Sequence, residues 1–263
     1  MTGGDDGGDA AGDANLRADG SGSGDAADAG DASATDGNTD ACAADAASCA
    51  DPACPGGRRS CPVSNGAMAC VDVQSDDQNC GACGHVCNIP GTCATGDCAR
   101  RVFVTSTSYL IGGSSTLRNL SDADGFCQTI AAAHGLKNVF RAWMSDSSQY
   151  PANGLRFTQS TQPYRLMDVP RTTIANSFAD LTSGMLRAPI DVDETGATVA
   201  AGDFVWTGTR VDGQRAPTGN CTSWSSNAQG SSANAGQVTS TSNTWTENSL
   251  PCDGMGHLYC FEQ

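Results

Sequence analysis

The chain has 263 residues, including 14 cysteines and 3 histidines, and its formal net charge is −15. Most of that charge lies in residues 1–51, where 12 aspartates stand against Arg17 alone. An acidic tail repels phosphates, and the basic residues elsewhere are dispersed, so the composition excludes a nucleic-acid-binding protein. No apolar run approaches the ~20 residues that a membrane-spanning helix needs.

Residues 1–41 are predicted to be a disordered spacer. They are built mainly from Gly, Ala, Ser and Asp, and such a composition buries too little apolar surface to offset the entropy of ordering. A flexible chain of about fifty residues spans on the order of 40 Å, so the spacer would hold a folded head away from a surface. Because cysteine-rich chains are typical of exported proteins, a secretory or lipoprotein signal is expected upstream, with Met1 a truncated or miscalled start.

Residues 42–99 are predicted to be a small disulfide-rich module. Ten cysteines lie here among Gly, Pro, Asn and Asp, and a segment so short and poor in apolar residues needs covalent cross-links. The spacing from Cys70 to Cys98 resembles the Stig1-like modules of secreted bacterial proteins. The connectivity stays open at this point.

A zinc site is the alternative within this module. The stretch CGACGHVC contains a Cys-x-x-Cys spacing with a histidine close behind, which suits a tetrahedral site in a reducing cell. The ligands would be Cys80, Cys83, His85 and Cys87. An oxidising compartment favours disulfides from the same residues, so the prediction is that they hold no metal.

Residues 100–263, called the head below, predict a compact α+β domain with long loops. A β-branched strand is expected over residues 101–110. The clearest helix follows, capped by Ser121 with Asp124 three residues on and stopped by Gly135. Three further strands are expected within residues 138–145, 204–209 and 256–262, and one short helix is expected within residues 174–184.

Four blocks of the head carry a family resemblance. ADGFCQTIAAAHGLKNVFRAWMS, IANSFADLTSGML, FVWTGTRVDGQRAPTGNCTSW and CDGMGHLYCFE follow in that order. They resemble the endostatin domain of collagens, and more closely the bacterial endostatin-like domain of leptospiral surface proteins. The resemblance covers nearly all of residues 101–263 and implies a C-type-lectin-like fold.

Two nested disulfides, Cys127–Cys260 and Cys221–Cys252, are implied by the same resemblance. Physical reasoning is consistent with the first, since it would join the expected core helix to the final strand and so tie the two ends of the head together. In the chain-entropy model a bridge across more than 100 residues contributes roughly 5 kcal/mol, and one across about 30 residues roughly 3.5–4 kcal/mol.

The expected function is binding rather than catalysis. No nucleophile elbow, His-Glu-x-x-His motif or phosphate-binding glycine loop occurs in the sequence. The leptospiral relatives bind host matrix and complement-regulatory proteins, which implies an exported, surface-tethered adhesion protein with an extracellular protein ligand. The alternative is a lectin-like protein that binds a glycan, and the third hypothesis is a cell-envelope enzyme that depends on His134 or His257. Membrane contact is expected only through an upstream lipid anchor.

Ligand contacts are predicted on two polar segments, residues 210–220 and 225–243, beside the second expected disulfide. Arginine and tryptophan are enriched at binding hot spots, and recognition is often placed on loops held by a rigid scaffold. The candidate contact residues are Arg210, Arg215, Trp224 and Asn227. At least three of the four tryptophans (Trp143, Trp206, Trp224 and Trp245) are nevertheless expected in the core.

The sequence predicts no cofactor, and a bound calcium ion is the one alternative. Residues 191–196 begin like an EF-hand loop, but Gly202 stands where a bidentate carboxylate is required. The acidic residues of this stretch remain candidates for a cation held by a long loop. They are Asp191, Asp193, Glu194 and Asp203.

Overall fold

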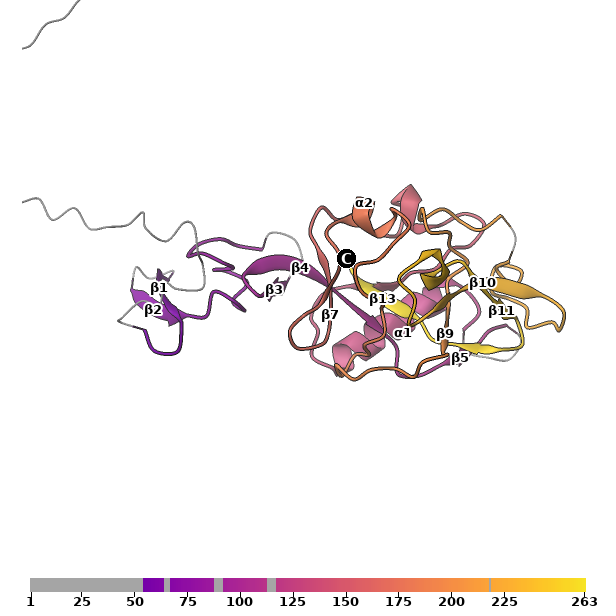
Figure 1. Cartoon of the computed structure of the whole chain (residues 1–263), viewed down its shortest axis with the longest axis horizontal. Helices are drawn as coiled ribbons and strands as arrows, with labels where there is room; N and C mark the ends of the chain where they lie inside the picture. Colours follow the sequence, from indigo (N-terminus) through magenta and orange to yellow (C-terminus); the bar gives the residue numbers. More distant parts are fainter. Residues whose placement is uncertain (1–53, 64–66, 88–91, 113–116, 218) are drawn as a thin grey trace, which may run out of the picture. The chain divides into compact units, whose positions relative to one another are not determined.

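The computed structural model describes residues 54–63, 67–87, 92–112, 117–217 and 219–263 (Figure 1). The chain divides into two units, Met1–Ala41 and Cys42–Gln263. The predicted spacer, together with Cys42 and Cys49, lies outside the described residues. The elements of the second unit are β1 (Arg59–Pro62), β2 (Met68–Val71), β3 (Thr92–Ala94), β4 (Asp97–Val104), β5 (Tyr109–Leu110), α1 (Leu120–Ala133), β6 (Phe140–Ala142), η1 (Pro151–Asn153), β7 (Tyr164–Leu166), β8 (Thr173–Ala175), α2 (Phe178–Leu181), β9 (Phe204–Trp206), β10 (Ser232–Gln237), η2 (Asn243–Trp245), β11 (Asn248–Pro251), β12 (Met255–Gly256) and β13 (Tyr259–Glu262).

The main sheet of the head has the strand order β6-β13-β4-β7-β8, with β3 paired to the start of β4. The last strand, β13, runs antiparallel to both β4 and β6, whereas β4 and β7 are parallel. A second sheet has the antiparallel order β11-β10-β9, and β5 pairs with β12. The predicted α+β class is confirmed.

The two central strands separate two hydrophobic cores. Because side chains alternate along a strand, Val102 and Val104 enter one core and Phe103 enters the other. The same alternation holds on β13, where Tyr259 and Phe261 lie opposite Cys260. A central strand that is buried on both faces explains the continuous apolar run in the sequence.

The helix α1 is confirmed, but its predicted cap is wrong. Asn119 is the N-cap, and its side chain accepts a hydrogen bond from the backbone N–H of Asp122 at 2.9 Å. The helix therefore begins before Ser121, which lies exposed in its first turn. Gly135 follows the C-cap residue His134 with φ of +73°, the left-handed conformation that glycine adopts readily.

The strand predicted over residues 101–110 is two strands, and the first begins earlier than expected. β4 starts at Asp97, inside the segment assigned to the module. It is joined to β3 by the two-residue turn Thr95-Gly96, in which both residues have positive φ, as in a type I′ hairpin. One continuous strand thus crosses the boundary expected at residue 99.

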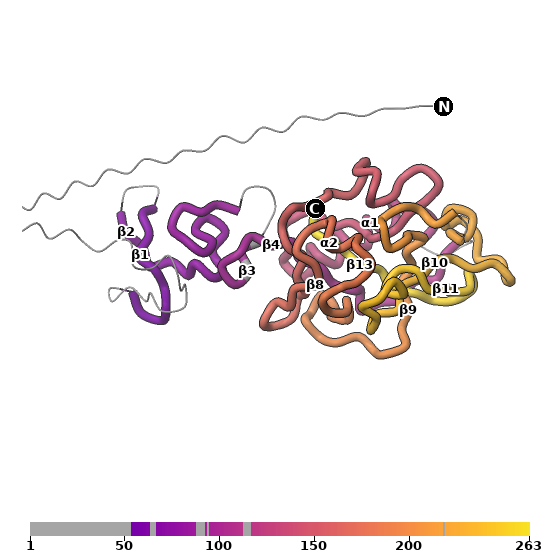
Figure 2. Tube along the Cα trace, turned by 45° about the horizontal axis from the view of Figure 1, so that its top comes forward, coloured from indigo at the N-terminus to yellow at the C-terminus, as the bar shows by residue number. Residues whose placement is uncertain are grey.

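The prediction that residues 225–243 form one polar loop is wrong for part of the segment. It contains β10, which pairs with β9 and β11 (Figure 2). Ala233, Ala235 and Val238 are buried there. Small side chains let this strand lie close against its neighbours, so β10 belongs to the core of the head, whereas residues 225–231 before it stay exposed.

Disulfides tie these elements together. The head contains Cys127–Cys260, which joins α1 to β13, and Cys221–Cys252, the two pairs that the endostatin-like resemblance implies. The module contains Cys54–Cys70, Cys61–Cys83, Cys80–Cys93 and Cys87–Cys98. The predicted disulfide-rich character is confirmed, as is the burial of the tryptophans: all four are 0% exposed.

Gly236 of β10 provides a test of this packing. A Cβ atom there would overlap the carbonyl oxygen of Trp245 and lie 2.9 Å from a ring carbon of Tyr259. We expect Gly236→Ala to destabilise the oxidised protein by about 3 kcal/mol or more, because the backbone must shift. The control is Gly125→Ala in α1, where a Cβ has nothing within 4 Å, and which we expect to stabilise by about 0.5–1 kcal/mol. Denaturant unfolding of both variants measures the difference; equal stabilities would contradict the packing described for β10.

Candidate functional site

A left-handed turn precedes the exposed loop that we consider the best candidate for a binding site. Four consecutive non-glycine residues, Cys221 to Trp224, have φ between +48° and +71°. The N–H of Trp224 donates to the carbonyl of Asn220 at 2.7 Å, which closes one turn of left-handed helix. This conformation is disfavoured for L-residues by about 1–2 kcal/mol each, so surrounding contacts must hold it.

Two anchors hold this turn in place. Cys221 is bonded to Cys252. Trp224 is buried, donates from its indole Nε1 to the carbonyl of Ser145 at 2.9 Å, and packs edge-on against Trp206. A Cβ at Gly208 would lie 2.7 Å from the Trp224 ring, so only glycine leaves room for it. Trp224 is therefore an anchor of the site, and the prediction that it contacts a ligand is wrong.

Residues 225–231 form the exposed loop after the turn. Six of the seven are exposed, including Asn227, and Ser226 is half-buried. The loop ends at Ser231, whose carbonyl accepts a hydrogen bond from the N–H of Cys252 at 2.9 Å. Both ends of the loop are consequently fixed at the same disulfide. Underneath, a Cβ at Gly112 would lie within 2.7 Å of the Ser226 and Asn227 backbone, so the loop rests directly on that glycine.

The two candidate arginines lie on a different turn. Arg210 is half-exposed and pairs with Asp212 at 3.3 Å and Glu247 at 3.8 Å, while Arg215 is exposed. Their turn packs on η1, where the N–H of Ala152 donates to the carbonyl of Gly213 at 3.0 Å. Within the described parts of the chain, no hydrogen bond or ion pair joins this turn to residues 225–231.

The calcium candidates are not brought together. Asp193 accepts hydrogen bonds from the N–H groups of Thr195 and Ala197, and Glu194 accepts from Ser106. Asp203 instead faces the Nε2 of His257 at 3.5 Å. Burial raises the pKa of the fourth candidate, the Asp191 carboxyl. Among the described residues no three carboxylate or imidazole ligands converge at this stretch.

Disulfides hold the module together, whereas the alternative zinc site would need the same cysteines as free thiolates. Cys80, Cys83 and Cys87 each form a disulfide with a different partner. The Nδ1 of His85 lies 2.6 Å from the carbonyl oxygen of Cys80, a contact within the module's own backbone. The one group of three potential metal ligands found in the described segments, Cys80, Cys87 and Cys98, is entirely disulfide-bonded.

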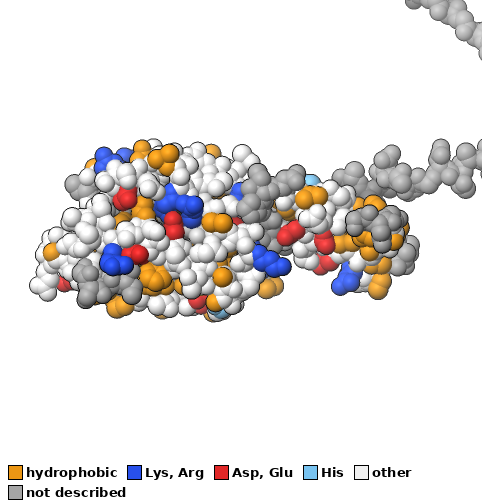
Figure 3. All heavy atoms as spheres, turned by 180° about the vertical axis from the view of Figure 1, so that it is seen from behind, with side chains coloured by type: hydrophobic (Ala, Val, Ile, Leu, Met, Phe, Trp, Pro, Cys, Tyr) orange, Lys and Arg blue, Asp and Glu red, His pale blue; other side chains and the backbone are white. Residues whose placement is uncertain are grey.

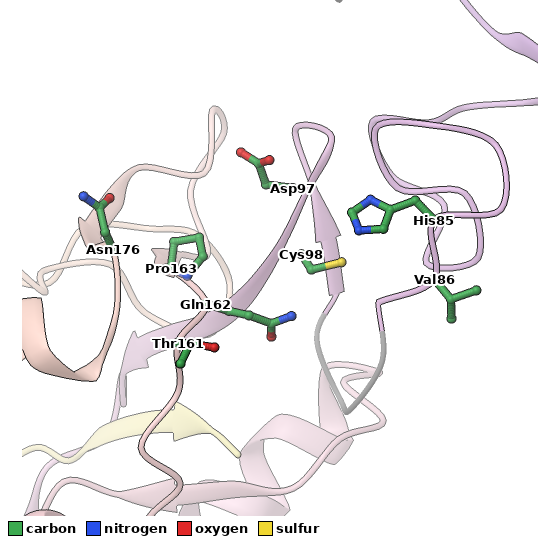
Figure 4. Close-up of a pocket in the computed structure, with 8 residues that line it drawn as sticks. All are labelled: His85, Val86, Asp97, Cys98, Thr161, Gln162, Pro163 and Asn176. Atoms are coloured by element: carbon green, nitrogen blue, oxygen red, sulfur yellow. The ribbon is translucent and has the colours of Figure 1, made fainter. Parts of the chain in front are cut away.

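A cavity of about 530 Å³ lies beside the β3–β4 hairpin (Figure 4). The imidazole of His85 points toward the strand that carries Asp97 and Cys98, and the sulfur of Cys98 is bonded to Cys87. The Oε1 atom of Gln162 is buried without a hydrogen-bond partner in the described structure. This lining of mixed polar and apolar side chains offers hydrogen bonds rather than an assembled nucleophile and base. It is formed by His85, Val86, Asp97, Cys98, Thr161, Gln162, Pro163 and Asn176.

The two histidines of the enzyme hypothesis have different environments. His134 is exposed at the C-terminal end of α1. His257 is buried, and its Nδ1 lies 2.6 Å from the carbonyl oxygen of Thr105. Sequence reasoning did not single out Ser145, Gly208 or Gly112, since the roles of these small residues come from what packs on them in space.

No protein-family model matches the chain, and no curated protein matches it. None of the described helices is long and apolar enough to span a membrane. The number of disulfides is consistent with an extracellular or otherwise non-cytoplasmic protein.

The disulfides of the module give a direct prediction. Elemental analysis of protein purified under oxidising conditions should find no stoichiometric zinc, because the thiolates that would bind it are consumed in disulfides. Titration of the unfolded, unreduced protein with a thiol reagent should find almost no free cysteine. One tightly bound zinc per chain, lost on chelation together with the fold of the module, would reverse this assignment.

Proposed function

We propose that the protein is an exported, non-enzymatic adhesion protein that binds an extracellular protein through the loop of residues 225–231. The observation that carries the proposal is that one disulfide, Cys221–Cys252, fixes both ends of an exposed polar loop. A loop ordered before binding pays less conformational entropy when a partner arrives, so its contacts contribute more fully to affinity.

The composition of this loop supports a protein ligand. It reads Ser-Ser-Asn-Ala-Gln-Gly-Ser, and it lacks aromatic side chains. Serine, glycine and asparagine are the residues that antibody loops use for adaptable hydrogen bonding. The exposed arginines Arg210 and Arg215 offer a second, separate contact to a large partner. A protein surface can reach both segments at once, whereas a small ligand would occupy one.

Surface charge argues against a polyanion as the main partner. On the face drawn in Figure 3, the basic side chains lie singly or beside acidic ones, without a broad positive patch. Arg118, Arg187 and Arg210 each pair with a carboxylate. Binding of a long sulfated chain depends on clustered positive charge, so a heparin-type ligand has less support than a protein.

The C-type-lectin-like fold is part of the proposal. Three features of the described structure support it. The first and last strands of the head, β4 and β13, are paired antiparallel. The helix α1 is bonded to the last strand. The second disulfide lies within the long, irregular region that precedes that strand. The resemblance of the four sequence blocks to endostatin-like domains points to the same fold.

The loop can be tested against a panel of purified matrix proteins and complement regulators immobilised on a surface. For the panel member that binds, we expect Asn227→Ala with Gln229→Ala to weaken binding about tenfold, the scale of a hot-spot contact. The melting temperature should stay nearly unchanged, because both side chains are exposed.

Two further variants make this test specific. Arg210→Ala with Arg215→Ala should weaken the same interaction if the partner spans both segments. Arg118→Ala with Arg187→Ala is the matched control, since these arginines are exposed and, like Arg210, ion-paired, and it should leave binding unchanged. Binding that persists when residues 226–230 are replaced by a Gly-Ser segment of equal length would disprove the role of the loop.

A further inference from the structure

A second cavity, of about 430 Å³, lies at the first turn of α1 and is separate from the loops discussed above. Its volume falls in the range of small-molecule sites. It brings together two arginines and two aspartates from α1, β6 and the segments that follow β6. Its lining residues are Asn119, Leu120, Ser121, Asp124, Arg141, Asp146, Gln149 and Arg156.

Arg156 forms the rigid base of this cavity. Its side chain is 4% exposed, and its guanidinium donates to the carboxylate of Asp124 and to the carbonyls of Ala142 and Met144. Asp124 in turn accepts from the N–H of Ala142 at 2.9 Å. Burial raises the pKa of Asp124 above its ordinary value, while Arg156 opposes that shift. The Nε of Arg156 has no partner in the described structure, although the group is fixed on all other sides.

Arg141 is the more accessible guanidinium of the cavity, and it pairs only loosely with Asp124. Its side chain is 37% exposed, and the nearest carboxylate oxygen, Oδ2 of Asp124, lies 3.8 Å away, beyond hydrogen-bonding distance. Asp124 is already shared with Arg156, so the single carboxylate faces two guanidinium groups. The first turn of α1 adds positive potential on the same side.

The remaining polar groups are suited to hydroxyls. Asp146 accepts from the N–H groups of Ser148 and Gln149 through Oδ1 alone, which leaves Oδ2 as an acceptor. The side chains of Ser121 and Gln149 are exposed and make no hydrogen bond in the described part of the chain. Together they offer a hydroxyl, an amide and a carboxylate oxygen around the guanidinium of Arg141.

We propose that this cavity binds a small acidic sugar, a uronic or sialic acid residue. Arg141 receives the carboxylate in the forked geometry that guanidinium and carboxylate share. Gln149, Ser121 and Asp146 bind the hydroxyl groups. The proposal goes beyond the protein-binding loop, since none of these residues belongs to residues 210–220 or 225–231.

Other ligand classes fit the same lining less well. Leu120 is the one apolar side chain among the eight, and it is 5% exposed, so an apolar ligand gains little by entering. A phosphate dianion carries twice the charge of a carboxylate and would be repelled by Asp124 and Asp146. A carboxylate surrounded by hydroxyls matches both the positive group and the acceptors.

The test is titration of the full oxidised protein by calorimetry or ligand-observed NMR with glucuronate, N-acetylneuraminate, glucose and acetate. At least one acidic sugar should bind saturably. Glucose and acetate should bind at least about tenfold more weakly, because glucose lacks the carboxylate and acetate lacks the hydroxyl groups. Arg141→Gln should weaken the acidic sugar about tenfold. Arg141→Lys should bind the sugar with an affinity between those of the unaltered protein and of Arg141→Gln, because lysine keeps the positive charge but cannot donate the two parallel hydrogen bonds of a guanidinium.

The matched control is Arg187→Gln, which removes an exposed, ion-paired arginine that does not line the cavity; it should leave sugar binding unchanged. Melting temperatures of all three variants check that the head stays folded. The proposal is overturned if neither acidic sugar binds, if Arg141→Gln binds it as well as the unaltered protein does, or if acetate binds as tightly as the sugar acids.

Discussion

The antiparallel pairing of β13 with β4 is the contact on which the rest of the head depends. These strands come from opposite ends of the head in sequence, and their side chains form the boundary between its two cores. Such a long-range contact carries a large loop-closure entropy. The Cys127–Cys260 bridge spans 133 residues and removes much of that entropy from the unfolded chain, on the order of 5 kcal/mol. The extended, loop-rich region between the strands can then remain poor in regular structure.

The same constraint explains how a chain so rich in Ser, Thr, Gly and Asn acquires a core. A cluster of aromatic side chains lies on one face, where Trp143 contacts Phe157, Trp245 and Phe261. On the other face, α1 packs its small residues Ala123, Cys127 and Ala131 against the sheet. Large rings in both cores, with a close-packed helix in one of them, allow the polar loops to remain outside.

Sequence reasoning succeeded where a local pattern decides the structure. The helix α1 followed from its apolar spacing and from Gly135, and the central strands followed from continuous apolar runs. It failed at β10, because Ser-Ala-Asn-Ala-Gly-Gln has low strand propensity and forms a strand only through its neighbours β9 and β11. The role of Trp224 was misjudged for a related reason: its burial depends on Ser145 and Gly208, which are distant in sequence. The cavity around Arg141 depends likewise on contacts among α1, β6 and later segments.

The left-handed turn at residues 221–224 shows how such distant contacts create the candidate site. At about 1–2 kcal/mol per residue, four left-handed residues destabilise the fold by about 4–8 kcal/mol. The Cys221–Cys252 disulfide contributes roughly 3.5–4 kcal/mol, and burial of a large aromatic side chain such as Trp224 about 3–5 kcal/mol. The two anchors therefore offset the strain with little to spare. Of the four positions, Thr222 and Ser223 are the ones where glycine could relieve strain without removing an anchor. The turn fixes the start of the exposed residues 225–231 beside the Cys221–Cys252 disulfide, as the proposed binding loop requires.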